Sequence, residues 1–251
     1  MAPSARRPLA SDVVTPKREA IDRHPHLAET QPPGWVRVDL HSHTMWSGDS
    51  TTTPDELVEA VEASGLDVVA ITDHNATKGA EDLAGQLPCR VIIGEEVKTH
   101  VGEIIGLFLQ ERIPFGLPPV EVAERIRAQG SVVYIPHPFD PLRNNLAEAA
   151  LEELCDRGLV DALEGINGKT SLDSLNRRAV EFATGRGLAV GAGSDAHVPD
   201  ALGAAYVEMP DFPDDDPEAF LASLRRGRIV GHHFDAPRRW RPRIVPSTST
   251  G

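Results

Sequence analysis

Two segments of the sequence place metal-binding side chains two residues apart. His41 and His43 are separated by one residue, and Asp195 and His197 repeat this spacing far along the chain. In an extended chain, side chains i and i+2 point to the same side, so each pair can present two ligands to one ion. Mixed imidazole and carboxylate ligands suit manganese, zinc or iron, and suit magnesium less well. The spacing therefore indicates a metal centre.

Other polar residues that could bind a metal lie at the end of other apolar, β-branched runs or directly after them. They are Asp73, His74, Glu95, Glu96 and His137. Such runs predict strands, and in parallel α/β folds the carboxyl ends of the strands meet at one rim. The same arrangement at five successive strand ends favours one active site over unrelated structural histidines. Glu95 should point away from Glu96 along the strand, and Asp73 is interpreted as orienting a ligand imidazole.

The elements that must position these residues alternate along the chain. The predicted strands are Val36–Leu40, Asp67–Thr72, Arg90–Val97, Val132–Pro136, Asp161–Ile166, Leu188–Gly193 and Ala205–Met209, and a hairpin is expected at Glu103–Leu109. The predicted helices are Pro54–Ser64, Val120–Gln129, Leu146–Asp156, Leu172–Arg186 and Pro217–Arg226. This alternation implies parallel pairing, and the number of units suits a barrel at least as well as an open sheet.

Length and composition predict one globular domain with tails. The chain has 251 residues, of which 40% are hydrophobic and 25% charged. Residues 1–34 are interpreted as a flexible leader, 35–235 as the folded domain and 236–251 as a C-terminal tail. His24 and His26 in the leader and His100 in the hairpin are interpreted as surface histidines. Since no run is apolar enough for a membrane span or a secretory signal, we expect a cytoplasmic protein without membrane contact.

The net charge and the cysteines narrow the function classes. Residues 35–235 carry a net charge of −18 within a chain of net charge −13, because the two terminal segments are basic. Such a body disfavours long nucleic acids as partners and favours a small ligand held by local cations. Cys89 and Cys155 lie far apart, which excludes a cysteine-based zinc site. P-loop, nucleophile-elbow and dinucleotide-binding motifs are also missing, so metal-assisted hydrolysis remains.

The sequence resembles the polymerase and histidinol phosphatase (PHP) superfamily of metal-dependent phosphoesterases. The resemblance runs from about residue 36 to residue 210, and its motifs are Asp39–Thr44, Ser47–Asp49, Ile71–His74, Gly94–Val97, Ile135–Pro138 and Gly193–His197. It implies an α/β fold, a distorted (β/α)7 barrel of PHP type similar to a TIM barrel. It also implies two or three divalent metal ions at the C-terminal rim.

The resemblance assigns ligands to each ion. A first ion would take His41, His43, Glu96 and Asp195; a second would share Glu96 and take Glu103 and His137; a third would take Asp49, His74 and His197. The chain departs from the commonest family pattern twice. Asp49 follows His43 by one residue more than usual, and Glu103 stands where many members have histidine. Both residues can still bind a divalent ion, although the departures bear on the affinity and identity of the metals.

Metal ions a few ångströms apart can share a hydroxide and direct it at phosphorus. We therefore expect hydrolysis of a phosphate monoester of a small molecule, such as a nucleotide, a nucleoside bisphosphate, or a sugar or amino-alcohol phosphate. Arg143 and Lys169, which follow strand ends at the same rim, are candidates for binding the phosphate. Asp195, His197 and Glu96 are the expected catalytic residues, and His197 could donate the proton that the leaving alkoxide needs.

Two alternatives stay open. The first is trimming of short oligonucleotides from the 5′ end, for which the C-terminal arginines Arg238, Arg239, Arg241 and Arg243 could be an accessory. The second is a metal-stabilised binding module without activity, against which the completeness of the ligand set argues. The substrate, the native metal and the oligomeric state are not determined by the sequence.

Overall fold

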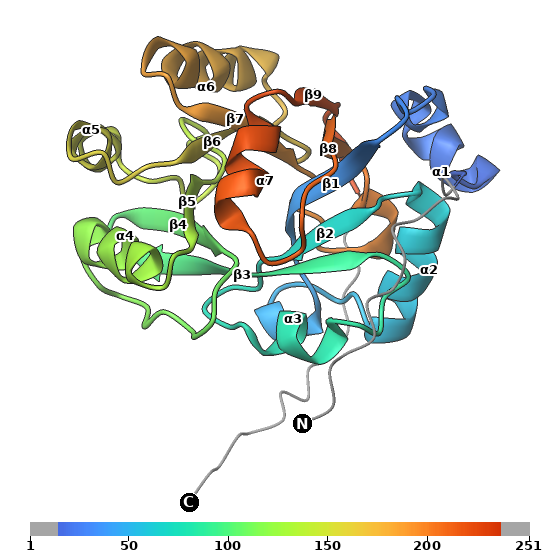
Figure 1. The fold of residues 1–251 in the computed structure, drawn as a ribbon, viewed down its shortest axis with the longest axis horizontal. Helices are drawn as coiled ribbons and strands as arrows, with labels where there is room; N and C mark the ends of the chain where they lie inside the picture. The colour runs from blue at the N-terminus through green and yellow to red at the C-terminus, as the bar shows by residue number, and fades with distance from the viewer. Residues whose placement is uncertain (1–14, 237–251) are drawn as a thin grey trace, which may run out of the picture.

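The computed structural model describes residues 15–236, which form one curled sheet with helices around it (Figure 1). The strands are β1 Trp35–Ser42, β2 Val68–Ile71, β3 Arg90–Thr99, β4 Gly102–Leu107, β5 Val132–Ile135, β6 Ala162–Asn167, β7 Ala189–Gly193, β8 Ala205–Pro210 and β9 Arg228–Gly231. The helices are α1 Arg18–Arg23, α2 Pro54–Ser64, α3 Lys78–Leu83, α4 Pro119–Ala128, α5 Glu148–Asp156, α6 Asp173–Gly185 and α7 Pro217–Leu224.

The sheet closes almost completely into a barrel. Its strand order is β7-β6-β5-β4-β3-β2-β1-β8-β9, and the C-terminal end of β1 meets the segment after β7. There the Asp195 N–H donates to the carbonyl oxygen of His41 at 2.7 Å, and the His43 N–H donates to that of Ala196 at 2.9 Å. A side chain at Gly193 would lie 2.3 Å from the Cβ of His41, so glycine is required for this approach. The predicted distorted barrel is confirmed.

The expectation of parallel pairing is correct for only part of the sheet. The pairs β1–β2, β2–β3, β5–β6 and β6–β7 are parallel. The pairs β3–β4, β4–β5, β1–β8 and β8–β9 are antiparallel. The β3–β4 hairpin was predicted because its two strands follow each other too closely for a helix. The antiparallel direction of β8 was not predicted, because an alternation of strands and helices does not show which edge of the sheet a strand joins.

Three apolar layers hold the barrel together. The innermost layer fills the barrel with side chains such as Val38, Leu40 and Tyr134, and α7 covers it with Phe220 and Leu224. In Figure 1, α7 lies across the front of the sheet, while the other helices lie around the outside of the sheet. Two outer layers pack the sheet against α4, α5 and α6 on one side and against α1, α2 and α3 on the other. Burial of these faces is the main source of stability.

Local signals explain which helices could be predicted. Helix α2 has the predicted bounds because Thr53 and Glu56 form a capping box and Gly65 ends the helix in a left-handed conformation, φ 67°. Helix α3 has six residues without a side-chain cap, and β9 pairs only with β8. Neither was predicted, because short elements are fixed by packing rather than by periodicity.

The expectation of a flexible leader up to residue 34 is wrong for its described part. Residues 18–28 form α1 and a short 3-10 helix, Pro25–Ala28, in which Ala20 and Leu27 are buried. The guanidinium of Arg37, itself buried, donates to the carbonyl oxygens of Leu27 and Glu29. These contacts make the segment a part of the folded body. The rest of the predicted leader, residues 1–14, lies outside the described residues.

Three histidines join the two ends of the described chain, and we call them the terminal cluster: His24, His26 and His232. The Nδ1 of His24 lies 3.1 Å from the Nε2 of His232. The Nε2 atoms of His24 and His26 donate to the carbonyl oxygens of Asp200 and Gly203, each at 2.9 Å. His24 is therefore a buried residue and His26 a half-buried one, whereas both were expected at the surface. His100 is exposed as predicted.

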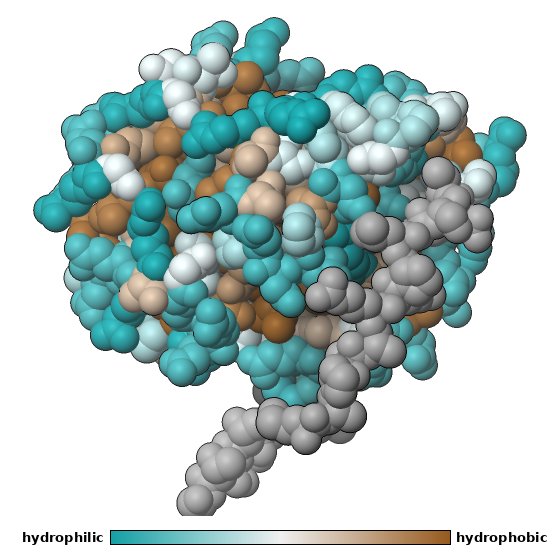
Figure 2. All heavy atoms as spheres, in the orientation of Figure 1, coloured by the Kyte–Doolittle hydropathy of each residue, from teal (hydrophilic) through white to brown (hydrophobic). Residues whose placement is uncertain are grey.

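Figure 2 shows a largely hydrophilic surface on the face in view, with apolar areas interrupted by polar side chains. Within residues 15–236, no helix is long and apolar enough to cross a bilayer. The arginines of the predicted tail, which begin at Arg238, lie outside the described part of the chain.

Candidate metal centre

The structure brings all nine predicted metal ligands together at one rim of the barrel, where the parallel strands end and the antiparallel strand β4 begins. Their ligand atoms form four overlapping groups, and within each group these atoms lie no more than 4.8 Å apart. The groups are His43, Asp49, His74 and His197; His41, His43 and Glu96; His41, His137 and Asp195; and His74, Glu96 and Glu103. Strands β1, β3 and β4 and the loops that follow β1, β2, β5 and β7 supply these residues. The barrel therefore converts a pattern spread along the chain into one cluster, which we call the rim cluster.

The first group of predicted ligands is fully buried. The Nε2 of His43 lies 3.3 Å from Glu96 Oε2 and 3.4 Å from Asp195 Oδ1. The Nε2 of His41 lies 3.4 Å from Glu96 Oε2 and 3.7 Å from Asp195 Oδ1. Two imidazole nitrogens and two carboxylate oxygens at these separations match the donor set of one tetrahedral ion.

Glu96 is placed to serve two ions. Its Oε2 faces His41 and His43, while its Oε1 lies 2.9 Å from the Nε2 of His137. Glu103, on β4, lies beyond that histidine, with Oε2 3.9 Å from His137 Nε2. Because its two oxygens face different imidazoles, Glu96 has the geometry for the bridging role that the family resemblance implies.

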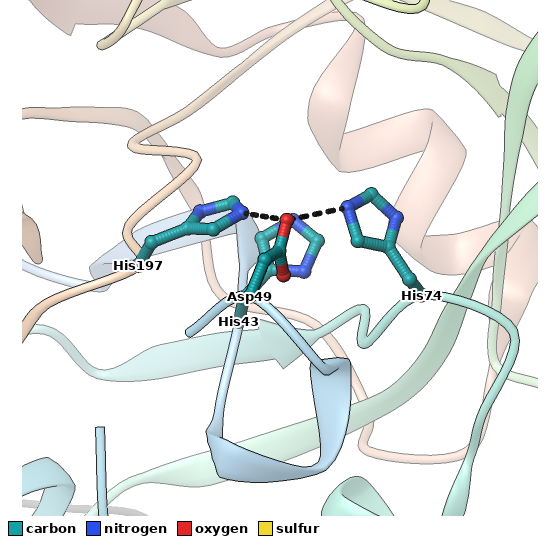
Figure 3. A group of neighbouring side chains, drawn as sticks. All are labelled: His43, Asp49, His74 and His197. Carbon is teal, nitrogen blue, oxygen red and sulfur yellow. Dashed lines mark hydrogen bonds and ion pairs between the residues drawn. The ribbon is translucent and has the colours of Figure 1, made fainter. Parts of the chain in front are cut away.

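The third group is the more open one, and Figure 3 shows its side chains converging. Asp49 Oδ2 lies 3.3 Å from the Nε2 of His74 and 3.1 Å from that of His197. The carboxylate of Asp49 is half exposed, whereas His43 behind it is buried. The additional residue between His43 and Asp49 therefore does not remove Asp49 from the cluster.

The electrostatics of the cluster fit divalent cations. Burial alone would raise the pKa of Glu96 and of Asp195, yet neighbouring imidazoles, and for Asp195 the Lys169 ammonium, hold both pKa values well below the usual range. Burial alone would lower the pKa of His74, but hydrogen bonds to Asp49 and Glu96 raise it to about 11. Carboxylates that stay ionised while buried need positive charge close by, which divalent ions provide. The residues present therefore fit the two or three ions that the fold implies.

Glu164 supports the cluster and was not predicted. Its carboxylate lies 3.2 Å from the Nδ1 of His41 and accepts from the backbone N–H of His137 at 2.6 Å. Asn167 donates to the same carboxylate at 2.9 Å. A carboxylate on the second nitrogen of a ligand histidine fixes its tautomer and orientation. The available signal was a charged residue in the middle of the predicted strand Asp161–Ile166, between Leu163 and Gly165.

The expected role of Asp73 is wrong. Both of its oxygens accept from Thr44, one from the backbone N–H and one from the hydroxyl, each at 2.6 Å. Asp73 therefore holds the loop after β1 rather than an imidazole. The loop in turn supplies Ser47, whose Oγ lies 2.8 Å from the Nδ1 of His43 and accepts from the backbone N–H of His74. Ser47 is thus the group that orients a ligand ring there.

Glu95 points away from the cluster, as the strand geometry predicted. It is fully buried and accepts from the backbone N–H of Ile113 at 2.7 Å. Burial raises its pKa to about 7. The neighbouring acids of β3 therefore have separate tasks, since Glu96 faces the ligands and Glu95 holds the loop before α4.

The two candidate phosphate-binding residues also lie at the cluster. Arg143 and Lys169 line a cavity of about 180 Å³ together with the more exposed ligands Asp49, His74 and His197. The Arg143 guanidinium donates to the carbonyl oxygen of Lys169 at 3.1 Å, and its buried Nε has no hydrogen-bond partner. An unpaired buried donor beside a metal cluster is suited to an anion.

Two ligands have strained backbones. His137 has φ 30° and Asp195 has φ 51°, a region that favours glycine. Such conformations cost on the order of 1–3 kcal/mol each and persist where the surroundings enforce them. Each residue comes two positions after the end of a barrel strand, β5 or β7, so the turn that follows the strand directs the side chain into the cluster.

Comparisons with known proteins agree with this geometry. A model of the PHP domain matches residues 39–134, and a model described as PHP-associated matches residues 173–229. An uncharacterized protein of Methanocaldococcus jannaschii is 38% identical over 198 residues, which are 76% of this chain and 79% of the relative. A second uncharacterized protein of that organism is 40% identical over 126 residues, 45% of this chain and 74% of the relative.

Among solved structures, a similar fold occurs in a two-domain protein from Bacteroides vulgatus that contains a predicted PHP-like metal-dependent phosphoesterase. The TM-score is 0.63 at 18% identity, over 81% of this chain and 67% of that one. At this identity the likeness concerns the fold alone. The family rests on the sequence matches, which include the strands that carry His41, His43 and Glu96. The chain belongs to the PHP domain family.

Proposed function

We propose that the protein hydrolyses a phosphate monoester of a small molecule. The observation that carries this proposal is the position of two cationic side chains, Arg143 and Lys169, in the cavity beside the nine predicted ligands of divalent ions. A terminal phosphate is dianionic near neutral pH and accepts hydrogen bonds from several cationic groups. A phosphodiester has one charge fewer, so it gains less from two cationic side chains.

When bound, the ions would supply Lewis acidity and an activated water. The side chains of the protein would do the rest. Arg143 and Lys169 would bind phosphoryl oxygens, and Glu96 and Asp195 would keep the ligand cluster negatively charged. His197 lies on the open side of the cluster with 17% of its side chain exposed, so in a centre that holds two ions and leaves the third group free it would be placed to give a proton to the leaving alkoxide.

The test is release of inorganic phosphate from a panel of nucleotides, nucleoside bisphosphates, sugar phosphates and amino-alcohol phosphates, with Mn²⁺ added. Asp195→Asn is the matched control, because it keeps the shape of a predicted ligand and removes its charge. Release by the wild-type protein alone supports the proposal. A dinucleotide in the same panel tests oligonucleotide trimming, since cleavage of the dinucleotide without release from any monoester would replace the proposed function.

A further inference from the structure

Lys169 lies against two predicted ligands. Its Nζ is 3.1 Å from Asp195 Oδ1 and 2.7 Å from the Nδ1 of His197. Its backbone is held on both sides, because its N–H donates to Asn167 at 2.9 Å and its carbonyl oxygen accepts from Arg143. The ammonium is therefore directed at the ligands by a fixed turn after β6, and its long side chain is the movable part.

The hydrogen-bond inventory of His197 restricts this contact. An ammonium only donates, so the Nδ1 of His197 must accept from Lys169. The other ring nitrogen, Nε2, lies 3.1 Å from the carboxylate of Asp49, which only accepts. A neutral ring that accepts from Lys169 and donates to Asp49 carries its proton on Nε2, and it then gives no proton to the carbonyl oxygen of Asp195, which lies 2.9 Å from Nδ1.

An ion in the third group requires the opposite tautomer. It would take the lone pair of Nε2, because that nitrogen faces Asp49 and belongs to the group with His43 and His74. The ring proton then lies on Nδ1, where the carbonyl oxygen of Asp195 at 2.9 Å can accept it. A protonated Nδ1 and the ammonium are both donors, so His197 cannot serve the ion and Lys169 together.

We propose that Lys169 is a cation with two positions, which couples ion binding to phosphate binding. An ion at His197 displaces the ammonium from the ring, and the ammonium then binds phosphoryl oxygens in the cavity that it lines with Arg143. Ion binding and phosphate binding therefore strengthen each other. This inference deepens the proposed function, since it rests on the same site.

Arg143 provides the matched comparison. It is a second cation of the same cavity, and its hydrogen bond is to a backbone oxygen, that of Lys169, rather than to a ligand side chain. Removing either cation weakens phosphate binding. Only removal of Lys169 should also strengthen ion binding in the absence of phosphate, because only Lys169 competes for ligand atoms.

The experiment is calorimetric titration of Mn²⁺ into the wild-type protein, Lys169→Met and Arg143→Met in phosphate-free buffer. Methionine keeps much of the side-chain length without charge. We expect Lys169→Met to bind one ion at least about fivefold more tightly, because a like charge is removed from the site, and Arg143→Met to change by less than about twofold. Equal or weaker ion binding by Lys169→Met would overturn the proposal. Lys169→Gln repeats the test should the methionine variant fold poorly.

The second measurement is the affinity for inorganic phosphate with and without Mn²⁺. The ion should raise phosphate affinity in the wild-type protein, and by a smaller factor in Lys169→Met. Weaker phosphate binding with unchanged ion binding would make Lys169 a simple phosphate ligand, which refutes the coupling and leaves the proposed function intact. If ion and phosphate binding are coupled but no phosphate ester is hydrolysed, the coupling is supported and the proposed function is refuted.

Discussion

The rim cluster and the terminal cluster both gather histidines from distant parts of the chain, but they surround them with different partners. In the rim cluster, carboxylates contact most of the rings, and the pKa values of His41, His74 and His137 are raised. In the terminal cluster, backbone carbonyl oxygens and other histidines are the partners. Burial there lowers the pKa of His24 to about 4 and also lowers those of His26 and His232.

The difference teaches that the partners of a buried histidine, rather than the number of histidines, determine its use. Rings paired with carboxylates form a negatively charged site that attracts divalent ions. Rings paired with carbonyl oxygens stay neutral and hold segments together, as His24 does for the N-terminal segment and the loop around Asp200. His43 marks the limit of this rule, since burial and the neighbouring His197 lower its pKa to about 4 although carboxylates adjoin it.

The largest effect should separate the two clusters by activity. Glu96→Gln removes the charge of the residue that faces two groups of ligands, and we expect phosphate release to fall by more than about 100-fold. His24→Gln changes the terminal cluster alone and should keep activity within about twofold under neutral conditions. Phosphate release with Mn²⁺ and the thermal midpoint of each variant are the measurements. Equal losses in the two variants would remove the functional distinction.

The next effect concerns the support of the rim cluster. Glu164→Gln should weaken Mn²⁺ binding by about 10- to 100-fold, because the carboxylate that orients His41 is lost. Glu95→Gln is the control, since it changes another buried glutamate that holds a loop and contacts no ligand. Calorimetric titration distinguishes them. An unaltered Mn²⁺ affinity in Glu164→Gln would show that the ring needs no such orientation.

The terminal cluster should make stability depend on pH. The unfolded state takes up a proton on His24 near its ordinary pKa of 6.5, whereas the folded state does so only near 4. Stability is therefore complete above pH 6.5 and falls as the pH decreases toward 4, by about 2 kcal/mol at pH 5 for this residue alone. Urea unfolding at pH 7.5 and pH 5 measures the loss. His24→Gln should show a smaller difference, and an identical one would contradict the assignment.

The smallest effect belongs to a histidine of neither cluster. His100 lies exposed in the turn between β3 and β4. His100→Ala should change the free energy of unfolding by less than about 0.5 kcal/mol and leave activity unchanged. A larger change in either measurement would show that the hairpin turn contributes to the rim cluster.

Most of the rim cluster could be predicted because its residues follow or end recognisable strands, whereas Asp49 and Glu103 were assigned by the family resemblance alone. His41, Glu96 and Asp195 could be placed together once parallel strand ends were expected to meet. Glu164 could not, because nothing in a single strand says which ligand its side chain will contact. The role of Asp73 was wrong for the same reason, since its partner Thr44 comes from another strand end.

Outside the barrel strands, local patterns were less informative. The N-terminal segment is polar and rich in proline, so its composition resembles that of a flexible leader. Its folded state depends on a few buried contacts, among them those of Leu27 and of the Arg37 guanidinium, which belong to tertiary packing. Antiparallel pairing of β8 is likewise a property of the assembled sheet. The fold of the catalytic half was thus predictable, and the attachment of the ends was not.

The left-handed backbones of His137 and Asp195 set a trade-off between robustness and catalysis. Glycine at either position would relax the chain and could make the barrel more heat-resistant, but it would delete a ligand. Relief of strain at these two positions would therefore cost the reaction centre a predicted ligand each time. A thermostable descendant that keeps its chemistry must gain its stability elsewhere, for example in the packing of the outer helices.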